Sequence, residues 1–273
     1  MRVKVIAVQM KFNIKDYVKG TSFSEKIFGL IKEADKKYSL DEKTLIVFPE
    51  DLGTFLVFLG EENIVNYDSI ELAVKDFVKR NFFKLLLIRL KYMCGWVSAV
   101  FNLKADLMRK VYLNVFSEVA REFNTYIVAG SILLPLNGKI FNVSYTFNPN
   151  GEVIGIQRKV HLIDLEKKLE VVSGKLEEIK VFKTEWGKIG VAICYDGFFD
   201  DVVGKLVKEG AEILVQPSAN PEPWDERLEK EWLKGCWEMV QKYGKLKYGV
   251  NPMGVGKILD LIFEGYSNIC LLY

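Results

Sequence analysis

The chain has 273 residues, of which 49% are hydrophobic. This length and composition allow one large α/β domain with a sizeable core, and they exclude global disorder. Lysine and arginine together number 38, and aspartate and glutamate number 36. A charge so nearly balanced gives no overall field that would favour nucleic acid as a partner.

Strand-like apolar runs alternate with helix-like amphipathic stretches along the chain. In chain order, the patterns predict a strand at 3–10, a helix at 22–37, a strand at 43–50, a mostly helical region at 62–123, a strand at 126–133, a hairpin at 139–162 with its turn at "NPNG", a strand at 188–194, a helix at 201–209, a strand at 211–219, a helix at 224–243 and a strand at 246–251. Such alternation, joined by a few hairpins, predicts a mixed α/β layered fold and not an all-β barrel. With no internal repeat and no low-complexity linker, we expect a single domain over residues 1–273.

The most membrane-like segment is "KLLLIRLKYMCGWVSAVFNL", residues 84–103. Its longest uncharged run, residues 92–103, has only 12 residues, whereas a membrane span needs about 20 apolar residues. We therefore expect a core or interfacial helix and no membrane contact. Contact of its basic side with a membrane surface is the less favoured alternative.

The four cysteines, Cys94, Cys194, Cys236 and Cys270, lie far apart and form no CxxC pair. This spacing argues against a zinc site or a disulfide framework and favours a reducing compartment. The apolar run in "MRVKVIAVQM" is too short for a signal peptide, so the expected location is the cytoplasm. Cys94, Cys236 and Cys270 are interpreted as packing residues.

Cys194 differs from the other cysteines because it ends the buried strand "KIGVAIC" just before a turn. A nucleophilic cysteine needs a base for its proton and a group that stabilises the oxyanion. The single histidine, His161, is one candidate base. Glu50, which ends "LIVFPE", is the other, provided that burial raises its pKa toward neutrality. Lys159 and the backbone N–H of Tyr195 could then stabilise the oxyanion.

Five sequence blocks occur in the order that is typical of one family: "LIVFPE", "FNVSYTFNPNGEVIGIQRKVHL", "GKIGVAICYDGFF", "GAEILVQPSAN" and "YGVNPMG". In these blocks the chain resembles the nitrilase superfamily of carbon–nitrogen hydrolases, from "KVIAVQM" to "FEGYSNI". The resemblance implies a four-layer α-β-β-α sandwich with mixed sheets. It also implies a homodimer or higher homo-oligomer and chemistry without metal or other cofactor.

The resemblance assigns a catalytic triad to Glu50, Lys159 and Cys194. It implies a second glutamate that positions the lysine and the substrate; Glu166 is the better match and Glu170 the alternative. The implied oxyanion donor is the Tyr195 N–H, and the residues expected to line the substrate pocket are Asn220 and Trp224. The expected role of Asp196 is structural, as a hydrogen-bond acceptor at the turn, while His161 is expected to orient its loop.

The resemblance implies an amidase that cleaves a small amide through a cysteine thioester. Nitrile hydrolysis, acyl transfer to an amine, and a catalytically silent binding or scaffold protein remain alternatives. The chain departs from many family members at Asp200, Asp201 and Gly204, where a proline–glutamate pair and an arginine are usual. It also ends at Tyr273, so we expect a shortened C-terminal end. The long region 62–123 is expected to line the pocket and act as a lid.

Overall fold

Two β-sheets lie face to face in the computed structural model of the chain, which describes residues 3–272. The first sheet has the order β1 (Lys4–Ala7), β3 (Thr44–Val47), β4 (Tyr126–Val128), β6 (Lys139–Phe147) and β5 (Ile132–Leu136), with β7 (Val153–Arg158) also paired to β6. The second has the order β15 (Asn268–Leu271), β12 (Tyr248–Asn251), β10 (Ile213–Val215), β9 (Lys188–Val191) and β8 (Phe182–Lys183). A smaller sheet joins β11 (Ser218–Ala219), β13 (Met253–Ile258), β14 (Leu261–Phe263) and β2 (Lys11–Asn13).

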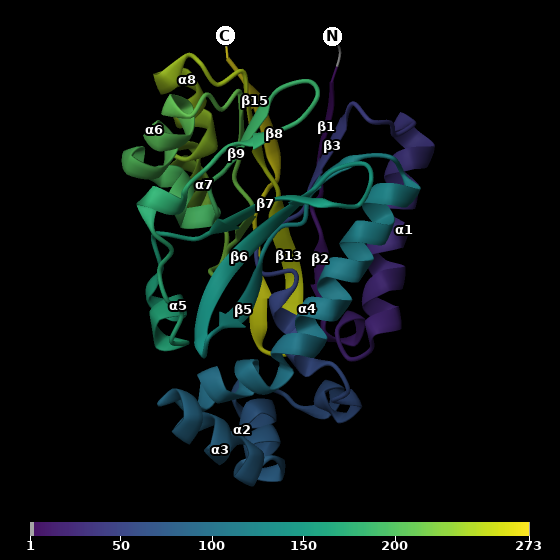
Figure 1. Cartoon of the computed structure of the whole chain (residues 1–273), viewed down its shortest axis with the longest axis vertical. Coiled ribbons are helices and arrows are strands. Elements are labelled where there is room, and N and C mark those ends of the chain that lie inside the picture. The colour runs from purple at the N-terminus through teal and green to yellow at the C-terminus, as the bar shows by residue number, and fades with distance from the viewer. Residues whose placement is uncertain (1–2, 273) are drawn as a thin grey trace.

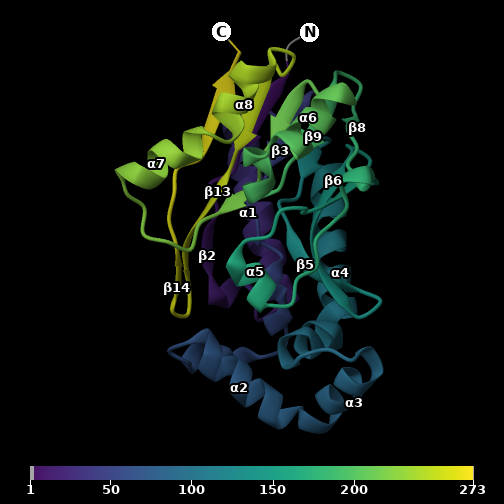
Figure 2. The same cartoon turned by 90° about the vertical axis from the view of Figure 1, so that its left-hand side faces the viewer.

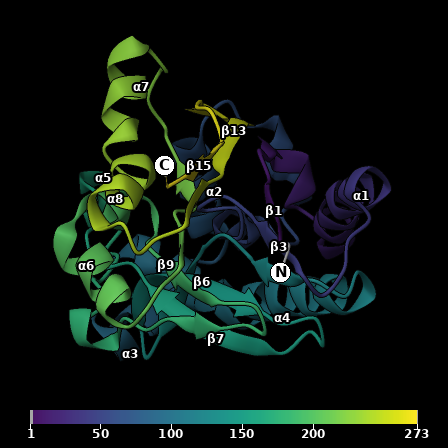
Figure 3. The same ribbon diagram turned by 90° about the horizontal axis from the view of Figure 1, so that it is seen from above.

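Helices cover the outer face of each of the two larger sheets (Figure 3). Helices α1 (Gly20–Tyr38) and α4 (Trp96–Glu122) pack on the first sheet through one apolar cluster, and α6 (Asp200–Lys208) and α8 (Cys236–Tyr243) pack on the second through another. A third cluster fills the space between the sheets; its members include Leu45, Val47, Val128, Ile189, Val191 and Val215. The predicted four-layer α-β-β-α sandwich with mixed sheets is confirmed.

The directions of the strands bring their C-terminal ends together. Strands β3 and β4 are parallel, β4 and β6 are antiparallel, and β6 and β7 are antiparallel. Strand β7 therefore runs in the same direction as β3, and both end at the same edge of the first sheet. In α/β sheets, functional side chains gather where strands run out into loops.

The predicted helices at 22–37 and 201–209 are confirmed by α1 and α6, and the helical region at 62–123 contains α2 (Ile70–Arg80), α3 (Phe82–Tyr92) and α4. The predicted hairpin at 139–162 forms from β6 and β7. The remaining helices are α5 (Asp164–Lys168) and α7 (Glu226–Leu233), and 3-10 turns lie at Ile14–Asp16, Thr54–Phe58, Glu62–Asn66, Leu176–Glu178 and Cys194–Phe198.

Three expected elements are interrupted, and each break has a local cause. The expected strand at 126–133 is two strands, because Gly130 has a φ of +68° and turns the chain. The expected strand at 211–219 divides into β10 and β11 around Pro217, which has no N–H to donate. The expected helix at 224–243 is divided into α7 and α8 near Gly235. Strand 246–251 is also not the last, since β13, β14 and β15 follow it.

Candidate active site

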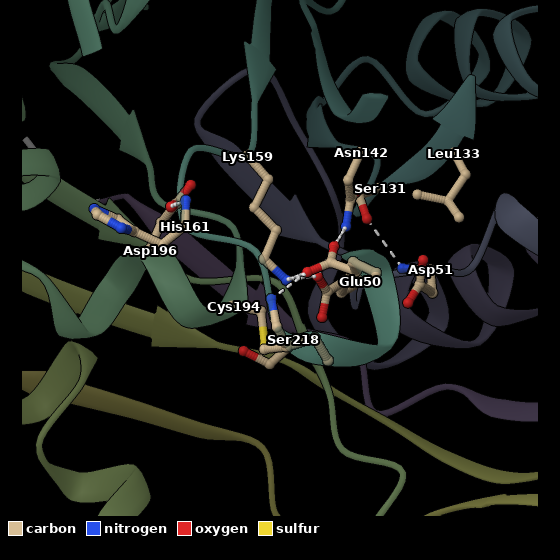
Figure 4. A network of polar contacts seen from close by, with 12 residues as sticks. Glu50, Asp51, Ser131, Leu133, Asn142, Lys159, His161, Cys194, Asp196 and Ser218 are labelled. Carbon is tan, nitrogen blue, oxygen red and sulfur yellow. Dashed lines mark hydrogen bonds and ion pairs between the residues drawn. The ribbon is translucent and has the colours of Figure 1, made fainter. Parts of the chain in front are cut away.

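Three of the predicted site residues follow strand ends and point toward one another (Figure 4). Glu50 follows β3, Lys159 follows β7 and Cys194 follows β9, and all three are buried. The Nζ atom of Lys159 lies 2.8 Å from Oε1 of Glu50 and 2.8 Å from Oε2 of Glu166. The structure therefore holds one ammonium group between two carboxylates beside the thiol.

Glu166 is fixed by the helix that carries it. It stands in the first turn of α5, where its Oε2 also accepts a hydrogen bond of 3.0 Å from the backbone N–H of Ile163. The alternative, Glu170, points elsewhere, because its Oε2 accepts from the backbone N–H of Gly95 at 2.9 Å. Glu166 is therefore the second glutamate that reaches Lys159.

The pKa shifts follow from burial and from the charges in the site. Burial alone would lower the pKa of Lys159, but the charges of Glu50, Cys194 and Glu166 together raise it well above its ordinary value. Burial raises the pKa of Glu50, with Lys159 opposing and Glu166 adding to the rise. Burial and then the Glu50 charge raise the pKa of the Cys194 thiol well above its ordinary value, and Lys159 offsets part of this. The resting site thus holds a neutral thiol, an ammonium group and a carboxylate with increased proton affinity.

Asn142 of β6 connects the two carboxylates. Its Nδ2 donates hydrogen bonds to Oε1 of Glu50 at 3.0 Å and to Oε1 of Glu166 at 2.8 Å. Its backbone carbonyl accepts from the N–H of Lys159 at 2.9 Å. Asn142 is buried, so these hydrogen bonds fix both carboxylates around the ammonium group.

The backbone at Cys194 adopts a left-handed conformation, with a φ of +48°. Such a conformation is costly for a residue with a Cβ, by about 1 kcal/mol. It is held on both sides: the Cys194 N–H donates to the Pro217 carbonyl at 2.8 Å, and Nε2 of Gln216 donates to the Cys194 carbonyl at 2.8 Å. Within residues 3–272, the N–H of Tyr195 has no hydrogen-bond acceptor, so it is free to donate to a substrate oxygen.

Asp196 and His161 hold the loop after Lys159. Both carboxylate oxygens of Asp196 accept from the N–H of Val160, at 3.0 and 3.1 Å, and Oδ1 accepts from the N–H of His161 at 2.7 Å. Burial raises the pKa of Asp196 to about 6, and these N–H donors oppose the rise. The His161 ring stacks on Phe199 and its Nε2 lies 2.9 Å from Oδ1 of Asp201. The imidazole is therefore paired with Asp201, while Glu50 is the carboxylate that perturbs the thiol.

A cavity of about 710 Å³ opens at Cys194. Segments 162–167, 194–199 and 219–234 contribute its lining, with Tyr195 and Asn220 among the lining residues. Trp224 is not one of them; its ring packs against Trp232 and Tyr266, and Trp232 contributes to the lining in its place. The lining also contains no residue of 62–123, so the expectation that this region lines the pocket is wrong for the part of the chain described.

Known proteins resemble this chain in sequence and in fold. The family model described as "Carbon-nitrogen hydrolase" matches residues 91–237, more than half of the chain. The chain belongs to the carbon–nitrogen hydrolase family. The chain is 34% identical to omega-amidase NIT2 of Xenopus tropicalis over 114 residues, or 38% of the chain, and the match spans only 40% of the length of that relative.

Solved structures of nitrilase-superfamily proteins match nearly the whole chain. The structure of Saccharomyces cerevisiae Nit3, a member of branch 10 of the superfamily, has a TM-score of 0.65 and 20% identity, covering 98% of this chain and 82% of that one. An amidase from Nesterenkonia sp. has a TM-score of 0.64 and 15% identity, covering 99% and 82%. At these identities the likeness shows the fold.

The residues at which this chain departs from many family members fix helix α6 in place. Asp200 accepts from Nζ of Lys242 at 2.6 Å and from the hydroxyl of Tyr243 at 2.9 Å. Gly204 faces the same hydroxyl, which would lie 2.7 Å from an added Cβ. Asp201 pairs with His161, as described above. Helix α6 thus packs against α8 through contacts that these residues themselves provide.

Two buried amides were not identified from the sequence. Asn142 lies within the apolar strand "KIFNVSYTF", and a polar residue in such a strand is itself a signal of a buried hydrogen bond. Gln216 bonds the Cys194 carbonyl through Nε2 and accepts from the Cys236 N–H at 2.7 Å through Oε1. The second bond depends on the break between α7 and α8, which no local pattern predicted.

Proposed function

We propose that the hydrolase is an amidase that cleaves a small amide through a thioester on Cys194. The observation that carries the proposal is the Lys159 ammonium group held between Glu50 and Glu166 beside the thiol. A carboxylate with increased proton affinity and a fixed cation are what a neutral thiol needs in order to attack a carbonyl carbon.

In the first half of the reaction, Glu50 accepts the thiol proton as the sulfur of Cys194 forms a bond to the amide carbon. The carbonyl oxygen becomes an anion that the Lys159 ammonium and the Tyr195 N–H stabilise. The protonated Glu50 then donates its proton to the amide nitrogen. The carbon–nitrogen bond breaks, ammonia or an amine leaves, and the thioester remains.

In the second half, Glu50 accepts a proton from water as the water oxygen attacks the thioester carbon. The same two donors stabilise the second oxyanion. The carbon–sulfur bond breaks, the carboxylic acid is released, and the proton on Glu50 returns to the sulfur. Glu166 and Asn142 act as positioning residues, since their hydrogen bonds reach Lys159 and Glu50.

The names of similar proteins support amide substrates. Several relatives at 32–34% identity are omega-amidases NIT2, and the Nesterenkonia amidase has been solved as a glutamate-to-glutamine variant with acrylamide added to its active-site cysteine. The cavity beside Cys194 is about 710 Å³, within the range of small-molecule sites. Small amides are therefore the substrates that we propose, and a homodimer or higher homo-oligomer is the proposed assembly.

The test is ammonia release from a panel of small aliphatic, aromatic and carboxylated amides, run beside the matching nitriles. We expect turnover of at least one amide by the native protein and its loss in Cys194→Ala. Cys94→Ala is the matched control, because Cys94 is half-buried and is not among the residues that line the cavity, and it should retain activity.

Other outcomes would assign the alternatives. Turnover of nitriles alone would replace the amidase with a nitrilase, and formation of substituted amides when an amine is added would indicate acyl transfer. If the protein turns over no member of the panel and its Cys194 does not react with an alkylating agent, a catalytically silent binding protein is favoured.

A further inference from the structure

Helix α3 lies, with α2, at the end of the molecule opposite to both chain termini (Figures 1 and 2). It is held firmly on its inner side. Leu85 is fully buried, and Arg89 donates from Nε to the Cys94 carbonyl at 3.0 Å while its guanidinium lies 4.2 Å from the centre of the Trp96 ring. The outer side of α3 is therefore a surface of fixed shape.

That outer side is apolar. Phe83, Leu87 and Leu90 stand at helical positions i, i+4 and i+7, so they share one face. Their exposed fractions are 80%, 68% and 68%, and Met93, directly after the helix, is 94% exposed. Monomeric soluble proteins rarely expose so many large apolar side chains together, and such patches mark interaction sites.

The segment that carries this face is basic. Residues 77–105 contain no aspartate or glutamate, in a chain whose charges are otherwise balanced, and they contain six basic residues: Lys79, Arg80, Lys84, Arg89, Lys91 and Lys104. Lys84 and Lys91 are exposed and lie beside the apolar stripe, each one position after a member of it. In the described part of the chain, neither forms an ion pair. The face is thus apolar at its centre and cationic along its margin.

We propose that the α3 face, defined by Phe83, Lys84, Leu87, Leu90, Lys91 and Met93, docks the protein on a bilayer surface that carries anionic headgroups. The apolar side chains would enter the boundary between headgroups and acyl chains, and the two lysines would reach the lipid phosphates. An anionic bilayer is complementary to both features of the face at once. This inference does not depend on the chemistry at Cys194.

The same features disfavour a second copy as the occupant. In a two-fold contact, a face meets its own equivalent, so the exposed Lys84 and Lys91 would lie close to the same two lysines of the second copy. Helix α3 itself lies at one end of the molecule (Figure 2). Among the described residues, no single helix is long and apolar enough to cross a membrane, and the pair α3–α4, which together reaches that length, is bent by 99°.

This proposal revises the sequence-based expectation of no membrane contact. The sequence predicted a core or interfacial helix. Hydrophobicity alone does not show which side of a short apolar helix packs against the core. In the folded protein, only Leu85 of α3 is fully covered, and the stripe of Phe83, Leu87 and Leu90 is left outside.

The test is co-sedimentation of the full chain with vesicles of phosphatidylcholine, with and without phosphatidylglycerol at about a third of the lipid. We expect binding to the anionic vesicles that weakens at about 0.5 M salt, where charges are screened within a few ångströms. The double variants Phe83→Ser with Leu87→Ser, and Lys84→Glu with Lys91→Glu, should each reduce the partition coefficient at least about tenfold.

Matched controls separate the face from general effects. Ile156→Ser with Ile262→Ser removes two other exposed apolar side chains, and Lys180→Glu with Lys183→Glu makes the same change in net charge. Both controls should bind as the native protein does. Absence of binding to anionic vesicles, or equal losses in the controls and the α3-face variants, would overturn the proposal. So would a native oligomer that becomes monomeric only in the Phe83/Leu87 variant, because a second copy would then cover the face.

Discussion

At the scale of single residues, the site places two buried carboxylates around one ammonium group. Glu50 and Glu166 share the Lys159 ammonium group, so two carboxylates and one ammonium leave a net charge of −1 beside the thiol. Burial raises the pKa of Glu50; the Lys159 charge opposes this rise, and the Glu166 charge adds to it. The Asn142 amide opposes the effect, since hydrogen bonds to a carboxylate favour its ionised form.

We therefore expect Asn142→Ala to raise the pKa of Glu50, which must be ionised to accept the thiol proton. The acidic limb of the kcat/KM profile against pH should move to higher pH, and activity at pH 7 should fall about 10- to 100-fold, the range for hydrogen bonds to a charged group. Ser144→Ala in the same strand is the control, because within residues 3–272 the buried Ser144 hydroxyl has no hydrogen-bond partner. An acidic limb that stays in place in Asn142→Ala would show that the amide does not tune Glu50.

Asp51, next to Glu50, gives a prediction for stability. Burial, followed by the charges of Glu50 and Glu166, raises its pKa from 3.8 to about 7. Between about pH 4 and pH 7, Asp51 therefore keeps its proton in the folded state and has released it in the unfolded state. The free energy of unfolding falls as the pH rises through this window. Asp51→Asn keeps the acceptor for the Thr54 hydroxyl at 2.8 Å and suits the φ of +59°.

The expected result is that Asp51→Asn equals the native protein at pH 4 and exceeds its free energy of unfolding by about 1–3 kcal/mol at pH 8. Urea unfolding at the two pH values measures this. A variant that is no more stable than the native protein at pH 8 would contradict the raised pKa.

At the scale of elements, the site depends on turns that begin where strands end. Asp51 and Cys194 both have left-handed φ values, of +59° and +48°, so the chain reverses sharply just after β3 and β9. Gly130 supports the first of these turns, because it separates β4 from β5 and lies against the segment that carries Glu50. A Cβ added at Gly130 would lie 1.9 Å from the carbonyl oxygen of Pro49.

Gly130→Ala should therefore lower the free energy of unfolding by about 3 kcal/mol or more, since the new methyl group collides with backbone and the φ of +68° disfavours any Cβ. Gly29→Ala is the matched control. Gly29 lies within α1 with nothing within 4 Å of an added Cβ, and alanine there should be neutral or stabilising by up to about 1 kcal/mol. Equal urea midpoints for the two variants would show that the close approach at Gly130 has no cost.

The parts of the site that could be predicted from sequence are those with a local signal. Glu50, Lys159 and Cys194 follow strand ends inside recognisable blocks, and Glu166 lies in the first turn of a short helix. The resemblance to the family, carried by those blocks, named all four. Asn142 and Gln216 lie within strands or between them, and their roles appear only when distant segments meet. The same limit explains the breaks in the expected strand at 126–133 and the expected helix at 224–243.

At the scale of the whole molecule, a layered α/β fold could be predicted because strands and helices alternate along the chain, and the resemblance to the family implied the four layers. The placement of region 62–123 could not be predicted. Its helices α2 and α3 lie at the end of the molecule opposite to the termini (Figure 1), and in the part of the chain described no residue of this region lines the cavity. The cytoplasmic location, the single domain and the homo-oligomer remain predictions. Sedimentation velocity on the full chain would measure the assembly, and a monomer at all concentrations would contradict the expected dimer.

The most direct test of the account is the reactivity of the four thiols toward iodoacetamide, followed by peptide mass spectrometry in the native protein and in Glu50→Gln. Glutamine keeps the shape of Glu50 and removes the base. We predict that Cys194 is alkylated faster than Cys94, Cys236 and Cys270 in the native protein, and at least about tenfold more slowly in Glu50→Gln. A Cys194 that reacts no faster than the other thiols, or equally fast in both proteins, would contradict activation of the sulfur by Glu50.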